Sequence, residues 1–120
     1  MRDKIAPHTR YAQKYHQATG SSSSVTAEVD ADADESWCAE EVVVSCKEIP
    51  TGGTLTVEYV NSAGVPQTPS VLHAHLTTAG AIRFNLHGVN RSPTQNEKLR
   101  AVAEQTGSPA KEISVTLFYR

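Results

Sequence analysis

The first 41 residues of this 120-residue chain carry too few large apolar side chains to build a hydrophobic core. Apart from two tyrosines, the sizeable apolar residues there are Ile5, Val25, Val29 and Trp37. The same stretch holds four consecutive serines and an alternating acidic run at 30–35. A segment of this composition buries too little apolar surface to offset its chain entropy and stays disordered by itself. We therefore expect residues 1–41 to form an extended polar N-terminal arm that neighbouring subunits hold in place.

Several large side chains in this arm are candidates for contacts with other subunits. Aromatic rings on a segment without its own core are either incidental or act as anchors in a pocket of a partner. The candidate interface residues are Tyr11, Tyr15, Val25, Val29 and Trp37.

Charge is distributed unevenly along the arm. Residues 1–20 carry four basic residues and one acidic residue, whereas residues 21–41 carry seven acidic residues and no basic one. The basic tip makes nucleic-acid binding an alternative function, but four scattered cations are a weak footprint beside a continuous phosphate-binding stripe. The acidic run is predicted to be a solvated spacer. It begins like a calcium-binding loop but has Glu35 where that loop needs glycine.

Other features of the sequence bear on its location and redox state. We find no signal peptide and no run of about 18 apolar residues, so we expect a cytoplasmic protein without membrane contact. Cys38 and Cys46 are too few to define a zinc site. In a cytoplasmic setting they are expected to be reduced, partly buried thiols.

The remaining residues, 42–120, are predicted to form a compact β-rich globular domain. Strands are expected at 41–47, 54–59 and 113–119, where β-branched residues concentrate or apolar and polar residues alternate. Ser92-Pro93 suits the start of a helix over 93–105 with Leu99, Val102 and Ala103 on its apolar stripe. The sequence therefore predicts an α+β fold, predominantly antiparallel β with one helix. A β-sandwich with an inserted helix is the alternative.

A hairpin is expected between Val71–Leu76 and Ile82–Leu86. A three-residue loop would pair Leu76 with Ile82 and place Gly80 where a left-handed backbone is common. This register puts the apolar residues on one surface. The opposite surface would then gather the polar residues His73, His75, Arg83, Asn85 and His87.

That polar surface is the best candidate for chemistry in the sequence. Three imidazoles on one sheet face are suited to hold zinc, so a metal-binding or hydrolytic domain using His73, His75 and His87 is the alternative function. Arg83 directly across from His75 would repel a cation, and only Glu58 among the strand acids is expected to reach it. The same group would suit an anion or a subunit contact. We therefore predict no metal, no cofactor and no catalytic residue.

In layout the chain resembles the small virion proteins of tailed bacteriophages. The shared features are a compact β-rich module, a long Ser/Thr/Ala-rich arm, few aromatics and no catalytic motif. The resemblance implies a capsid decoration or cement subunit, or a neck or head-completion subunit, whose arm lies across adjacent subunits. We therefore expect a non-enzymatic structural protein that forms homo-oligomers or binds other virion subunits. The resemblance also implies that the protein is made in the host cytoplasm and located in the virion.

Overall fold

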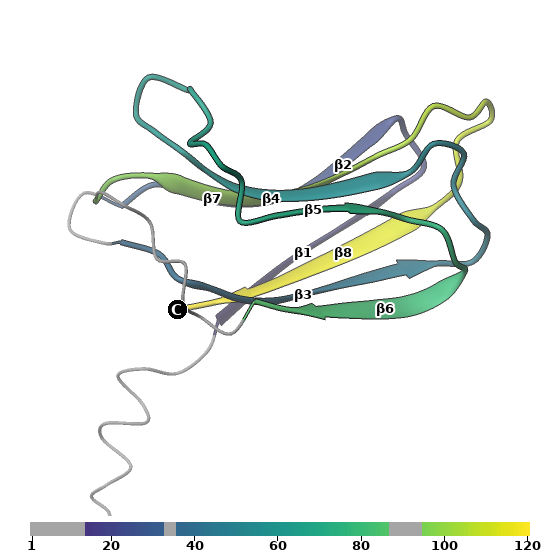
Figure 1. The fold of residues 1–120 in the computed structure, drawn as a ribbon, viewed down its shortest axis with the longest axis horizontal. Coiled ribbons are helices and arrows are strands. Elements are labelled where there is room, and N and C mark those ends of the chain that lie inside the picture. The colour runs from purple at the N-terminus through teal and green to yellow at the C-terminus, as the bar shows by residue number, and fades with distance from the viewer. Residues whose placement is uncertain (1–13, 33–35, 87–94) are drawn as a thin grey trace, which may run out of the picture.

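The computed structural model describes residues 14–32, 36–86 and 95–120, which form an all-β sandwich (Figure 1). Sheet A has the strand order β1 (Lys14–Gly20), β8 (Ile113–Tyr119), β3 (Ala39–Cys46) and β6 (Gly80–Asn85). Sheet B has the order β2 (Ser24–Val29), β7 (Lys98–Glu104), β4 (Thr54–Val60) and β5 (Leu72–His75). All neighbouring strands are antiparallel, and the two sheets lie as stacked layers.

The strand order is that of a jelly roll. Along the chain the strands pass from one sheet to the other, except that β4 and β5 are neighbours in sheet B. Two four-stranded sheets wound in this way form the eight-stranded double-sheet jelly roll. The order leaves β1 and β6 at the edges of sheet A, and β2 and β5 at the edges of sheet B.

The core lies between the sheets and is built from alternate residues of each strand. In β8 the burial alternates without a break from Ile113 to Tyr119, and β4 alternates from Thr54 to Tyr59. Successive side chains of a strand point to opposite faces, so an alternating sequence buries one face and exposes the other. The largest fully buried apolar residues come from both sheets and are Leu55, Leu99, Ile113 and Leu117.

The predicted α+β class is wrong, because the described residues contain no helix. The segment expected to be helical over 93–105 contains β7, and the proposed helix start at 92–93 lies outside the described residues. β7 is a central strand that pairs with β2 on one side and β4 on the other. Its pattern has period 2: Leu99, Ala101 and Ala103 are completely buried. Burial from both neighbours outweighed the helix propensity of its Leu and Ala residues.

The N-terminal region differs from the expected arm. Residues 14–29 form β1 and β2, one edge strand of each sheet, and the expected domain boundary at residue 41 falls inside β3. Val25, Ala27 and Val29 alternate with polar residues in β2 and face the core. An edge strand of this kind needs few apolar residues because it buries only one face. The polar composition of residues 1–41 therefore did not prevent residues 14–29 from joining the two sheets.

Trp37 also belongs to the core. Its ring packs edge-on against Tyr119 with 5.4 Å between ring centroids, and its indole N–H donates to the carbonyl of Asp30 at 3.1 Å. The chain on the far side of Trp37 is tied down as well, since Cys38 and Arg120 exchange backbone hydrogen bonds of 2.7 and 3.0 Å. These contacts hold Trp37 and Cys38, the two residues that lead into β3.

The expected hairpin does not form, although both of its strands do. β5 pairs with β4 in sheet B, whereas β6 pairs with β3 in sheet A, so the chain crosses between the sheets at 76–79. Leu76 continues the β4 pairing by donating its N–H to the carbonyl of Gly53 at 2.8 Å. The left-handed backbone expected at Gly80 is confirmed, with φ of +95°. The apolar residues of both strands still turn inward, but from facing sheets.

Candidate binding groove on sheet B

The outer face of sheet B carries polar side chains from three adjacent strands. The strand register sets Glu28 of β2, Arg100 of β7 and Glu58 of β4 in one cross-strand row. Thr26 and Thr56 flank Val102 in the next row. Because side chains alternate along each strand, the residues between them supply the core and leave this face to polar groups.

Two ion pairs cross this face. Arg100 Nε and Nη2 each lie 2.6 Å from Glu58 Oε2, and Lys98 Nζ lies 3.5 Å from Glu28 Oε1. The first pair is half-buried, with 30% of the arginine side chain and 14% of the glutamate side chain exposed. Solvent screens such a pair less than one on an open surface, so Arg100 is held firmly in place.

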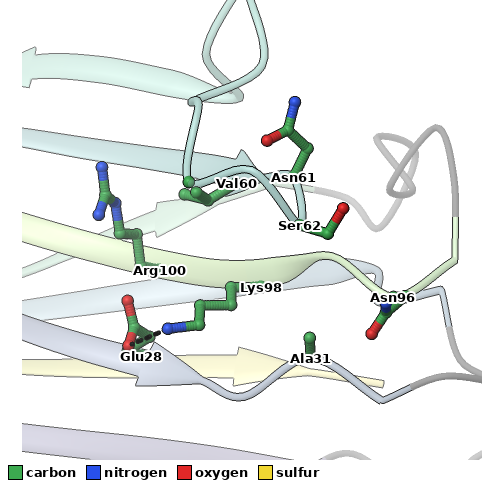
Figure 2. Close-up of a pocket in the computed structure, with 9 residues that line it drawn as sticks. Glu28, Ala31, Val60, Asn61, Ser62, Asn96, Lys98 and Arg100 are labelled. Atoms are coloured by element: carbon green, nitrogen blue, oxygen red, sulfur yellow. Dashed lines mark hydrogen bonds and ion pairs between the residues drawn. The ribbon is translucent and has the colours of Figure 1, made fainter.

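Two hollows run along the face and share Arg100. The first, of about 350 Å³, lies between the edge at β2 and the loop that follows β4 (Figure 2). The second, of about 290 Å³, lies over Thr26, Thr56 and Glu58. We call the two together the charged groove, lined centrally by Thr26, Glu28, Thr56, Glu58, Lys98 and Arg100.

The loop after β4 forms one wall of the groove and is fixed by its own hydrogen bonds. Asn61 Oδ1 accepts from the backbone N–H groups of Ala63 and Val65, both at 3.0 Å. Gly64, with φ of +82°, donates its N–H to the Asn61 carbonyl at 2.9 Å. These bonds close a tight turn that holds Asn61 and Ser62 above Lys98, as Figure 2 shows.

A buried carboxylate ties this loop to the start of β7. Glu97 is 2% exposed, and the side-chain amide of Gln67 donates to its Oε2 at 2.6 Å. The backbone N–H of Gln67 also donates to the Tyr59 carbonyl at 2.7 Å. A buried charge is tolerated only where hydrogen bonds satisfy it, so this contact fixes the groove wall against the strand that carries Arg100. The charged side chains of the groove are already paired with one another. The groove is therefore better suited to an uncharged polar ligand than to a strongly charged one.

The described residues of the predicted polar surface are divided between the two sheets. His73 and His75 project from the outer face of β5, beside the groove, with 5.8 Å between their ring centroids. His73 Nδ1 lies 3.0 Å from the Thr56 hydroxyl. Arg83 and Asn85 lie on β6 in the opposite sheet, and His87 lies outside the described residues. Glu58, the acid expected to reach the histidines, pairs with Arg100 instead.

The outer face of sheet A is different in character. Tyr15 of β1 is opposite Phe118 of β8, and their ring centroids are 6.3 Å apart. Val43 of β3 lies on the same face, and we call these three residues the aromatic face. Tyr15 is 65% exposed. Arg83 and Glu41 form an ion pair at the β6 side, with 2.6 Å between Nε and Oε2.

The five expected interface residues separate into three groups. Val25, Val29 and Trp37 are buried in the core of the same chain, so they are not available as anchors for another subunit. Tyr15 is exposed on the aromatic face. Tyr11 lies outside the described residues, as does most of the basic tip.

The two cysteines are buried, and neither takes part in a disulfide. Burial raises the pKa of the Cys46 thiol, because a thiolate is poorly solvated in an apolar environment. Cys46 is therefore a poor nucleophile at neutral pH. Cys38 donates from Sγ to Glu40 Oε2 at 3.9 Å.

Sequence reasoning missed the charged groove. The predicted helix over 93–105 contains Lys98 and Arg100, and the predicted arm over 1–41 contains Glu28, so the prediction does not place the three residues together. The usable signal was the alternation of Leu99, Ala101 and Ala103 with polar or larger residues, which is typical of a strand. Their meeting on one face depends on the pairing of β7 with both β2 and β4.

Residues 14–32, 36–86 and 95–120 contain no group of three or more His, Cys, Asp or Glu side chains that could hold a metal ion. No helix in this part of the chain is long and apolar enough to cross a membrane.

No known protein family and no curated protein sequence matches the chain. Its structure is similar to that of the mitogen derived from Yersinia pseudotuberculosis, with a TM-score of 0.53 and 7% identity over 89% of this chain and 85% of the other. It is also similar to chitosan-binding module 1 of a chitosanase/glucanase from Paenibacillus sp. IK-5, with a TM-score of 0.50 and 12% identity over 87% and 75%. At these identities the likeness shows the fold alone.

Weaker likenesses include longer proteins. A chain of infectious bursal disease virus Gt strain matches with a TM-score of 0.43 and 18% identity over 92% of this chain and 33% of the viral one. The chain spans only 17% of an arabinose-bound α-L-arabinofuranosidase that it also matches. These two likenesses are too weak to bear on function.

Proposed function

We propose that the protein is a non-enzymatic assembly subunit that joins copies of itself through the edge of sheet A at β1. The observation that carries this proposal is an open seven-residue edge strand whose exposed Tyr15 lies against Phe118 of the next strand. Within the described part of the chain, no strand pairs with the outer side of β1. An edge of this kind presents unpaired N–H and C=O groups to another chain.

The four sheet edges differ in how well they are protected. β5 has only four residues, β6 carries Arg83, and β2 carries Glu28, and short length and charge both discourage edge pairing. β1 contains no proline and no acidic residue, and its one lysine is its first residue. By these criteria β1 is the edge best suited to accept a strand from a neighbour.

The aromatic face would supply the remaining contact area. A stable interface buries roughly 800 Å² on each partner, which is more than one edge strand provides. Tyr15 on β1 and Phe118 on the adjacent strand β8 form an apolar pair at this edge, and Val43 lies one strand farther in on β3. A neighbour that pairs with β1 would also cover the two rings. Association about a two-fold axis would place the same residues on both sides of the contact.

A virion subunit is the specific form of this role that we propose. Jelly rolls are common in viral coat proteins as well as in lectin domains, so the fold accommodates the proposal. It is a capsid decoration or cement subunit, or a neck or head-completion subunit, and in either position self-association or binding to other virion proteins builds the particle. Mass spectrometry of purified particles tests this role, because a virion subunit is recovered in them in stoichiometric amounts.

The assembly is tested by measuring the mass of the protein in solution with multi-angle light scattering over a range of concentrations. The wild-type protein is expected to form oligomers of its 12.9 kDa chain. Tyr15→Ser removes the exposed ring, and Gln17→Lys with Thr19→Lys adds like charges along the edge. Both variants are expected to shift the protein toward monomer, because charge on an edge strand opposes strand pairing.

The matched control is Val65→Ser, which removes a large apolar side chain that is 55% exposed on the loop after β4. It should assemble as the wild-type protein does. A wild-type protein that stays monomeric at every concentration, or a Tyr15→Ser variant that assembles with unchanged affinity, contradicts the proposal.

A further inference from the structure

We propose that His73 and His75 form a chelating site for a divalent first-row transition metal ion, with zinc as the reference ion. The two residues are two positions apart on β5, so both imidazoles rise from the same outer face of sheet B. Both are exposed and lie on an edge strand, where an ion has direct access. This site is independent of the proposed assembly edge, which lies on the other sheet.

The separation of the two rings fits a shared ion. Zinc binds imidazole nitrogen at about 2.0–2.1 Å, so two imidazoles on one tetrahedral zinc have centroids roughly 5 to 6 Å apart. The centroids of His73 and His75 are 5.8 Å apart and their planes meet at 77°. Small rotations of two exposed side chains are therefore enough to direct both lone pairs at one ion.

Thr56 orients one of the two rings. Its hydroxyl lies 3.0 Å from Nδ1 of His73, and the strand register fixes this contact because Thr56 is directly opposite His73. When the Nδ1–H of His73 donates to the Thr56 hydroxyl oxygen, the free lone pair of the ring is on Nε2. Nε2 is on the side of the ring away from Thr56. Histidine ligands in metal sites are commonly fixed by a second hydrogen bond of this kind.

The surroundings of the pair also favour a cation. Arg83, which a hairpin would have placed across from His75, lies in sheet A and pairs with Glu41. The residue opposite His75 is Thr54, and the next residue in that row is Glu104 of β7. The nearest cation of the groove, Arg100, is held by Glu58. Described residues of the chain supply two ligands, and water completes the coordination.

The test is a zinc titration of the full chain, read by competition with a chromogenic chelator and repeated with nickel. The wild-type protein should bind one ion. His73→Ala and His75→Ala should each weaken binding at least ten-fold, and Thr56→Val, which removes no ligand, should weaken it about ten-fold through loss of ring orientation. His73→Gln keeps a polar side chain of similar length. If it lowers the zinc affinity as much as His73→Ala does, the loss comes from the missing imidazole ligand and not from a change in the polarity of the surface.

The matched control is His87→Ala, which removes the third histidine of the sequence-based site and should bind zinc as the wild-type protein does. Far-UV circular dichroism checks that each variant is folded. The proposal is overturned if the wild-type protein binds no zinc, if either His73→Ala or His75→Ala binds with wild-type affinity, or if His87→Ala lowers the affinity as much as they do.

Discussion

The two sheets present nearly equivalent inner faces and very different outer faces. Inside, each contributes small and branched apolar residues such as Val44 and Leu117 from sheet A and Leu55 and Leu99 from sheet B. Outside, sheet A carries the aromatic face, whereas sheet B carries the charged groove with its crossing ion pairs. Packing therefore restricts the inward-facing residues of the strands, whereas the outward-facing residues are free to differ between the two sheets.

The difference has a simple physical origin. A sandwich needs one apolar face from every strand, and close packing leaves little freedom there. The outer faces contribute little to the core, so they vary according to what they contact. Under the two proposals made above, the rings of Tyr15 and Phe118 beside the open edge of sheet A would contact a protein neighbour, and the histidine pair beside the groove of sheet B would bind an ion. The two faces would then serve different partners.

The largest expected effect comes from removing residues 14–36, which supply one edge strand to each sheet, and it tests whether the domain folds without them. Deleting residues 1–36 removes β1 from sheet A and β2 from sheet B, exposing apolar residues on β8 and β7. The loss should exceed the roughly 5–15 kcal/mol that stabilises a small domain, so no cooperative urea transition should remain. Deleting residues 1–13 is the control and keeps every described strand. A cooperative transition in the longer deletion would instead show that residues 37–120 fold without β1 and β2.

The next effect tests the equivalence of the inner faces. Leu117→Ala in sheet A and Leu99→Ala in sheet B each remove a completely buried side chain and leave a cavity. Each should lower the free energy of unfolding by about 2–5 kcal/mol, measured by urea denaturation. A much smaller loss in one variant than in the other would show that one sheet packs more loosely.

A smaller effect separates the outer faces. Arg100→Met leaves Glu58 half-buried without its cation and should cost about 1–2 kcal/mol in the free energy of unfolding. Arg83→Met removes the matching pair on sheet A, where 72% of the arginine side chain is exposed, and should cost less than about 0.5 kcal/mol. Both are measured in the same urea series at low and moderate salt. Equal costs for the two substitutions would contradict the contrast between the faces.

The smallest effect is a pH dependence located in sheet A. Burial raises the pKa of the Cys46 thiol above its ordinary value of 9.0 and that of the Tyr119 phenol above 10.0. The folded protein then keeps protons that the unfolded chain loses, so its stability should fall as pH rises above about 9. Urea denaturation at pH 8 and pH 10 measures the fall, and Cys46→Ala should reduce it. Identical falls in the variant and the wild-type protein would exclude Cys46 as a source.

Much of the strand content was predictable because it depends on local alternation. The strands expected at 41–47, 54–59 and 113–119 match β3, β4 and β8. The same rule misled at 98–104, where Leu99, Val102 and Ala103 also satisfied a helical stripe. It failed again in β2, where the alternation was too short to stand out from a polar background.

The candidate site was much less predictable. His73 and His75 were placed together correctly because both lie on one strand at a spacing that any strand preserves. Arg83 was placed beside them wrongly, since its position depended on which strand β5 would pair with. Glu28 and Arg100 are far apart in the sequence and lie in one row only through the pairing of β2 with β7.

The amino-acid sequence alone determined which side of most strands turns inward, because burial of one face is recorded in every second residue. The tertiary structure decided which strands became neighbours, and with it the splitting of the expected hairpin between two sheets and the assembly of the charged groove. The physical reason is that alternation specifies a buried face but not the surface that covers it. β5 and β6 could pair with each other in one sheet or lie in two facing sheets, and both arrangements bury the same side chains. The second arrangement forms because β5 pairs with β4 and β6 pairs with β3.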